Sequence, residues 1–379
     1  GSISSAANST AIGVDSNASA INALALGSGS VSAAANSTAI GVDANASAIN
    51  ALALGSGAIS SGTNSIAVGS SAKSAVVNST AVGSGSNANG VDSIALGAGA
   101  ATNDSGSVAI GAGSCAFATN STAIGFNSSS NGTNAIAIGA GTSATCANSF
   151  VLGAGAIANG VGAGAIGYLA NTQGVDAMAV GVKACALGNN SMALGTSACS
   201  TGVDSIAMGF SACASNTNSS AIGTNATANG TNSMAFGANS RAFGTNSTAI
   251  GAQSFADQTN SFVIGPNTVA CGVNAGAIGA SANANGESSL AIGVQSFAKE
   301  ESSLALGTNA QSIGTNSTAI AVNASASGAN SMALGKTASA TGVNSTAIAV
   351  AALANGLDSV ALGVQSNAPS WHRNRLFLL

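Results

Sequence analysis

The sequence has very little charge and very few aromatic side chains. Lys, Arg, Asp and Glu make up 5% of its 379 residues and aromatic residues 3%, with two prolines and one histidine. Seven scattered basic residues and a net charge of -4 exclude the basic surface that a nucleic-acid backbone or an anionic lipid would need. We therefore expect no nucleic-acid partner.

Long apolar runs and clustered reactive residues are also missing. The longest apolar run, 347–354, is far shorter than the roughly 20 residues of a transmembrane helix, so no membrane span is predicted in this chain. The single histidine, His372, lies in the C-terminal tail, and the eleven acidic residues are scattered. Such a set offers neither a Ser-His-Asp arrangement nor paired carboxylates. We expect no enzyme activity, no cofactor and no metal.

The sequence does contain an unbroken repeat of 14 residues. The motif Ala-Ile-Gly and its relatives recur 26 times, from Gly13 to Gly363, without insertion or deletion, and only Ala321 and Ala349 replace the final glycine. We number this residue position 0 of each coil. Glycine tolerates the left-handed backbone that a tight corner demands. The predicted corner glycines include Gly13, Gly27, Gly41, Gly55, Gly69, Gly83, Gly97, Gly111, Gly125 and Gly139.

Each coil carries two different alternating patterns. The residue before position 0 is always large and apolar, and alanine almost always precedes it, so we expect this strand to be buried. Positions 3 and 5 hold small residues, whereas positions 4 and 6 hold almost any residue, which is typical of a strand with one face inward. The apolar residues of the first strand include Ile12, Leu26, Ile40, Ile124 and Ile138.

Two four-residue strands and two three-residue corners fill the 14 residues and leave no room for a helix. Glycine at position 7 and Asn or Asp at position 9, as in Gly90 and Asp92, predict a second left-handed corner. We interpret the corner aspartates as acceptors of backbone N–H bonds, not as calcium ligands.

Coils of equal length must stack in register. Each strand then pairs in parallel with its copies in the neighbouring coils at about 4.8 Å, so that 26 coils would form a rod of about 125 Å. The strand before position 0 lacks charge on both faces, and only one face can point into its own coil. The other face needs a second protein surface, so the sequence predicts an oligomer of undetermined number. Packing of either the alanine face or the isoleucine face inside the coil is equally consistent with the pattern.

Three cysteines are predicted to form a ladder on the outer face. Cys185, Cys199 and Cys213 occupy position 4 of three successive coils, while Cys146 and Cys271 have no stacked equivalent. Directly opposed strand residues keep their Cβ atoms apart, which strains a disulfide. Reduced thiols are therefore favoured over a bridge or a reactive site.

The pattern Asn-Ser-Thr-Ala-Ile-Gly, as in residues 246–251, resembles the head repeat of YadA-like trimeric autotransporter adhesins. The resemblance covers roughly residues 6–368 and rests on 26 copies. It implies an all-β, left-handed parallel β-roll, a parallel homotrimer, exposure at a cell surface, and a structural fibre that attaches to a host ligand through many weak contacts. Residues 1–368 would be the solenoid and 369–379 a C-terminal cap or tail.

Other functions are compatible with the same repeat. A phage or virus fibre, or a self-assembling extracellular filament, would use it equally well. An ice-binding solenoid needs a continuous rank of threonine, and the rank of Thr10, Thr38, Thr80 and Thr122 is interrupted by larger apolar residues. A fibre-borne glycan hydrolase would need paired acids.

The two ends of the repeat differ in sequence. The tail from Pro369 through Trp371 is predicted to cap the last coil, whereas the first strand would have an open edge that favours end-to-end self-association.

Overall fold

The computed structural model describes residues 1–369 and 377–378, and these form two compact units, 1–190 and 191–379. Every coil contributes two short strands. One spans the three residues before position 0, from β2 (Thr10–Ile12) to β52 (Val360–Leu362) in the even-numbered strands. The other spans positions 4 and 5, from β3 (Asn17–Ala18) to β53 (Asn367–Ala368), and β1 (Ile3–Ser4) precedes these odd-numbered strands.

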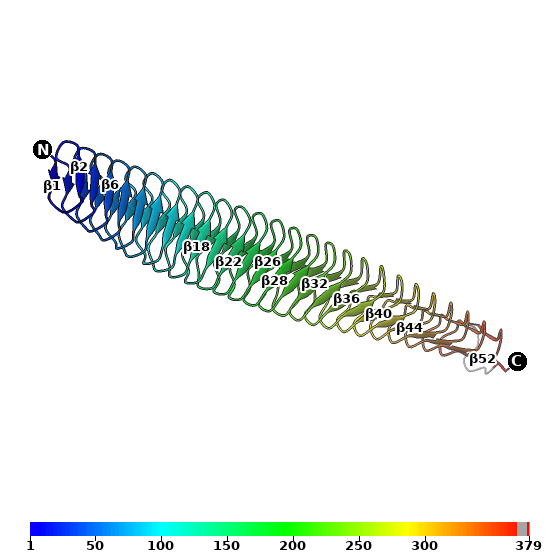
Figure 1. Cartoon of the computed structure of the whole chain (residues 1–379). Helices are drawn as coiled ribbons and strands as arrows, with labels where there is room; N and C mark the ends of the chain where they lie inside the picture. Colours follow the sequence, from blue (N-terminus) through cyan, green and yellow to red (C-terminus); the bar gives the residue numbers. More distant parts are fainter. Residues whose placement is uncertain (370–376, 379) are drawn as a thin grey trace. The chain divides into compact units, whose positions relative to one another are not determined.

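Strands of the same type pair in parallel and in strict register. For example, Ala123 of β18 (Thr122–Ile124) faces Ala137 of β20 (Ile136–Ile138). Each unit therefore contains two parallel sheets, which we call the even sheet and the odd sheet, and Figure 1 shows the coils of each unit lying one beside the next. The prediction of an all-β parallel solenoid with a 14-residue period and about 26 turns is confirmed.

The strands are shorter than the four residues expected from the alternation. The corners between them are themselves hydrogen-bonded from coil to coil: Gly29 N donates to Val14 O at 2.8 Å, and Asn36 N donates to Ile21 O at 3.0 Å. Backbone groups at the corners thus find partners without strand geometry. The stack is held along its whole circumference, not only along the two sheets.

Only small side chains fill the inside of the coils. The buried set consists of alanine, serine and threonine, apart from two valines, Val151 and Val263, which stand where other coils have alanine. Many of the buried hydroxyls bond locally, although others, such as those of Ser233 and Ser247, have no partner among the described residues. Ser32 Oγ lies 2.6 Å from Ser37 Oγ, and Ser30 Oγ donates to the carbonyl of Gly27 at 2.8 Å. Such bonds offset the cost of burying a hydroxyl group.

The structure decides which face of the even strands points inward. In β8 (Leu52–Leu54), Ala53 is 0% exposed, whereas Leu54 on the other face of the same strand is 39% exposed. The expectation of a buried strand is therefore wrong for half of its side chains in the single chain. The physical reason is volume, because the narrow space between the two sheets holds a methyl or hydroxymethyl group and leaves no room for isoleucine.

At the C-terminal end, β54 (Phe377–Leu378) pairs in parallel with β52, with Ala361 opposite Phe377. Its backbone continues the even sheet of the second unit by one strand. Trp371, His372, Arg373 and Arg375, which the sequence placed in a cap, lie outside the described residues. The cap itself stays a prediction.

Candidate functional site

The corner glycines at position 0 form a continuous column in each unit. From Gly13 to Gly139 their φ angles lie between 131° and 138°. Residues other than glycine rarely adopt this backbone conformation. Space is also lacking, because a Cβ atom on Gly13 would lie 2.5 Å from the carbonyl oxygen of Gly27. Ala321 and Ala349 nevertheless adopt φ angles of 117° and 108° in this column, so these two coils carry local backbone strain.

The second corner differs from its prediction at position 7. Position 9 is left-handed, as in Asn22 with φ 57°, but Gly90 at position 7 has no positive φ. A Cβ atom on Gly90 would instead collide with the carbonyl oxygen of Asp104 in the next coil. Glycine is therefore needed at position 7 because two backbones approach each other closely there, and not because the turn is left-handed.

The asparagines of position 9 form a hydrogen-bonded ladder that the sequence analysis missed. The Nδ2 of Asn22 donates to Oδ1 of Asn36 at 2.9 Å, and Asn78 donates in the same way to Asp92 at 2.8 Å. In the second unit, Asn344 donates to Asp358 at 2.8 Å. These two aspartates accept side-chain amides and not the backbone N–H groups that we expected. The recurrence of asparagine at position 9 of successive coils could have revealed this ladder, because stacked coils bring these side chains together.

The first candidate surface is the outward face of the even sheet, made of the residues at one and three positions before each corner glycine. We call it the apolar face. It carries no Lys, Arg, Asp or Glu in any coil, and its side chains are half-exposed, with Leu54 at 39% and Phe236 at 51%. All five of the predicted apolar residues, Ile12, Leu26, Ile40, Ile124 and Ile138, lie on it. An apolar band along every coil of a unit exceeds what a soluble monomer normally exposes.

The second candidate surface is the outward face of the odd sheet, made of positions 4 and 6, which we call the variable face. Lys73 and Arg241 stand on it at equivalent positions of different coils. In the second unit a hollow at its edge is lined by Arg241 and Phe255 of this face and by Asn239, Gln253 and Ser254 of the adjoining corners. The ring of Phe243 packs edge-on against that of Phe255, with 5.5 Å between centroids. The hollow therefore combines a fixed aromatic ring, a guanidinium group and two amides.

The cysteines of the predicted ladder lie on the variable face of their own units. Cys185, Cys199 and Cys213 all stand at outward positions of odd strands, half-buried and as thiols. Within the second unit, Cys199 of β29 (Cys199–Ser200) is the register partner of Cys213 of β31 (Cys213–Ala214). A hydrogen bond with the Cys199 side chain, followed by burial, raises the pKa of Cys213 well above its usual range.

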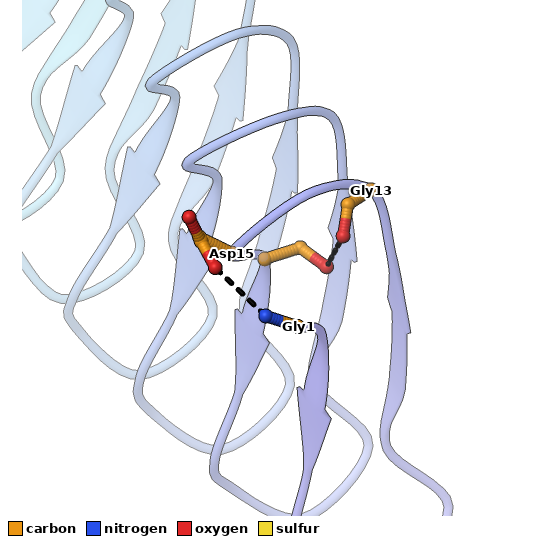
Figure 2. A network of polar contacts seen from close by, with 4 residues as sticks. Gly1, Gly13 and Asp15 are labelled. Atoms are coloured by element: carbon orange, nitrogen blue, oxygen red, sulfur yellow. Dashed lines mark hydrogen bonds and ion pairs between the residues drawn. The ribbon is translucent and has the colours of Figure 1, made fainter.

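Charged contacts are few in the part of the chain that the structure describes. The N-terminal ammonium group of Gly1 donates to Oδ1 of Asp15 at 2.8 Å (Figure 2) and, first through this hydrogen bond and then through its charge, lowers the pKa of Asp15. Ser16 Oγ donates to the carbonyl of Gly13 beside this pair.

No cluster of three or more His, Cys, Asp or Glu side chains occurs among the residues that the structure describes. A helix able to cross a membrane is likewise not found in them.

These features define a parallel β-solenoid of short coils of equal length with one apolar and one variable face. The family model of the YadA head domain repeat matches most of its coils, at residues 4–30, 33–58, 60–86, 88–114, 118–142, 173–198, 200–226, 214–240, 242–268, 271–296, 298–320, 326–348 and 354–369. The chain therefore belongs to the YadA head repeat family.

A likeness to one solved structure accompanies the family match. The crystal structure of the collagen-binding domain of the Yersinia adhesin YadA aligns with 44% of this chain and 67% of its own, at 24% identity and a TM-score of 0.22. No curated protein matches the chain.

Proposed function

We propose that this chain is the adhesive part of a surface fibre, assembled as a parallel homotrimer in which the apolar faces of three chains meet around one axis. The observation that carries the proposal is the apolar face itself. It is free of charge in every coil and half-exposed in the single chain. Membership of the YadA head repeat family supports both the trimer and a location at a cell surface, and neither catalysis nor a cofactor is part of the proposal.

The hydrophobic effect supplies the driving force for this assembly. Burial of apolar surface contributes about 25 cal/mol per Å², and each coil offers one large apolar side chain before its corner residue, joined in many coils by a second apolar side chain two residues earlier. Because coils repeat at about 4.8 Å, these small contributions add along the axis. Parallel chains with the same period keep their coils level, so each apolar side chain meets its equivalents on the other two chains.

Attachment would then be the task of the variable face, which points away from the apolar face across the coil. It varies from coil to coil on an invariant frame, so it can carry different contact residues without altering the fold. Three chains would present each contact three times, and avidity would replace a single deep pocket. The hollow around Arg241 and Phe255 is the place on this face where aromatic, cationic and amide groups lie together.

The test is the molecular mass of the purified chain in solution, measured by sedimentation equilibrium. A trimer gives three times the chain mass of 35.1 kDa, and a monomer or dimer contradicts the proposal. Beads coated with trimer should also attach to a ligand-bearing surface much more strongly than beads coated with an equal number of dispersed chains. Equal attachment by the two preparations would argue against the multivalent mechanism.

A further inference from the structure

The side chains of Cys199 and Cys213 form an unusual pair of thiols on the variable face of the second unit. Their backbones are register partners on adjacent parallel strands, and their side chains share a hydrogen bond. Both are half-buried, and Ser215 Oγ lies 3.3 Å from Cys213 Sγ. Two sulfur atoms are thus held side by side by the strict register of the stack.

A disulfide does not explain this arrangement. Adjacent strands are about 4.8 Å apart, and directly opposed Cβ atoms stay near that spacing, whereas a disulfide brings its Cβ atoms to about 3.8 Å. Closing the bond would therefore pull two coils together against the even spacing of their neighbours. Both residues are thiols in the structure.

A linear two-coordinate metal ion fits the spacing better. If the metal–sulfur bonds are similar in length to the zinc–thiolate bond of about 2.3 Å, a linear ion places its two sulfur atoms about 4.6 Å apart, close to the strand spacing of about 4.8 Å. Thiolate ligands select soft ions such as copper(I). Ions that require three or four protein ligands do not find them among the described residues.

We propose that Cys199 and Cys213 bind one monovalent soft metal ion, of the copper(I) or silver(I) class, as a linear bis-thiolate. Two S–H bonds break, two metal–sulfur bonds form, and two protons leave to solvent, with no change in oxidation state. The site needs neither the trimer nor a ligand of the fibre. It lies on the variable face and is accessible from solvent in the assembly proposed above.

Proton release makes the binding depend on pH. Both cysteines are thiols in the structure, so at neutral pH the ion must displace a proton from each of them. Apparent affinity should therefore increase as pH rises.

The test uses the full chain and silver(I), in the presence of an excess of glutathione, which outcompetes single protein thiols. Native mass spectrometry should show one silver ion retained per chain. A separate titration with silver nitrate in the absence of glutathione should show, in a pH-stat, two protons released for the first ion bound per chain. The variants Cys199→Ser and Cys213→Ser should each weaken retention by about a hundredfold or more, because the second thiolate acts at high effective concentration.

Matched controls come from the other thiols of the same chain. Cys146→Ser and Cys271→Ser remove cysteines that have no stacked equivalent, and Cys185→Ser removes the preceding member of the ladder; all three should retain the ion. Circular dichroism checks that each variant is folded. Silver uptake that follows the total number of thiols, or that survives Cys213→Ser in a folded chain, would overturn the proposal. So would failure of the unaltered chain to retain silver against glutathione.

Discussion

The two outward faces lie on the same coils, yet they follow opposite rules. On the apolar face, Ile124 is followed one coil later by Ile138, and no coil introduces a charge. On the variable face, the residue above Thr227 is Arg241 and the next is Phe255. Backbone pairing is equally regular beneath both faces, so folding of the coil does not explain the difference. A uniform face suits contact with identical copies, whereas a variable face suits contact with something else.

The largest expected effect comes from placing charge on the apolar face. Ile124→Asp or Ile138→Asp should disperse the proposed trimer, because three carboxylates would be buried near one axis at a cost of several kcal/mol each. Sedimentation equilibrium should then report a single-chain mass. Lys73→Asp and Asn87→Asp place the same charge on the variable face and should leave the trimer intact. Equal dispersion by both sets would remove the distinction between the faces.

On the inward face of the same strand, a larger side chain should lower the stability of the chain even when it is uncharged. Ala123→Leu adds a large side chain to an interior of small residues and should destabilise the chain by about 1–3 kcal/mol. Ile124→Leu, one residue further on, should change stability by less than about 1.5 kcal/mol. Urea denaturation followed by circular dichroism measures both. Ala123→Val should be milder than Ala123→Leu, since Val151 and Val263 already occupy this position.

An effect no larger than that of Ala123→Leu is expected in the glycine column between the two faces. Ala321→Gly should raise stability by up to about 1–3 kcal/mol, because it removes the strain of a positive φ at alanine. Gly307→Ala, one coil earlier, should do the opposite, since its Cβ atom would lie 2.6 Å from the carbonyl carbon of Ala321. Thermal unfolding of the two variants provides the comparison. Stabilisation by Gly307→Ala would contradict the steric account of the column.

The smallest effect concerns one thiol on the variable face. The pKa of Cys213 is raised by the Cys199 side chain and by burial, so little thiolate forms as pH rises through the ordinary range of a thiol. Alkylation by iodoacetamide at pH 9 should therefore be slower at Cys213 than at a cysteine in the urea-unfolded chain. Cys199→Ala should accelerate it, as judged by peptide mass spectrometry. The raised pKa also predicts a slight loss of folded stability above the pKa of the unfolded thiol.

Much of the architecture could be predicted because one short period constrains it. A repeat of 14 residues without insertions leaves room for two short strands and two corners, and equal coils must stack in register. The position 0 glycines were identifiable because a left-handed corner favours that residue. The ladder from Asn22 to Asn36 was overlooked, since asparagine at a turn already had a local explanation and the contact joins residues of different coils.

By itself, the sequence determined the all-β class, the period, the parallel register and the presence of two unlike faces, since all of these follow from periodicity. Only the tertiary structure decided that alanine and not isoleucine fills the coil. Both faces of the even strands are uncharged, so the alternation of residues does not show which face points inward. The small volume between two closely packed sheets decides that the alanine face points inward. It likewise took the stacked structure to show that Gly90 leaves space for a neighbouring backbone, whereas the stacking of Cys199 beside Cys213 already followed from the period.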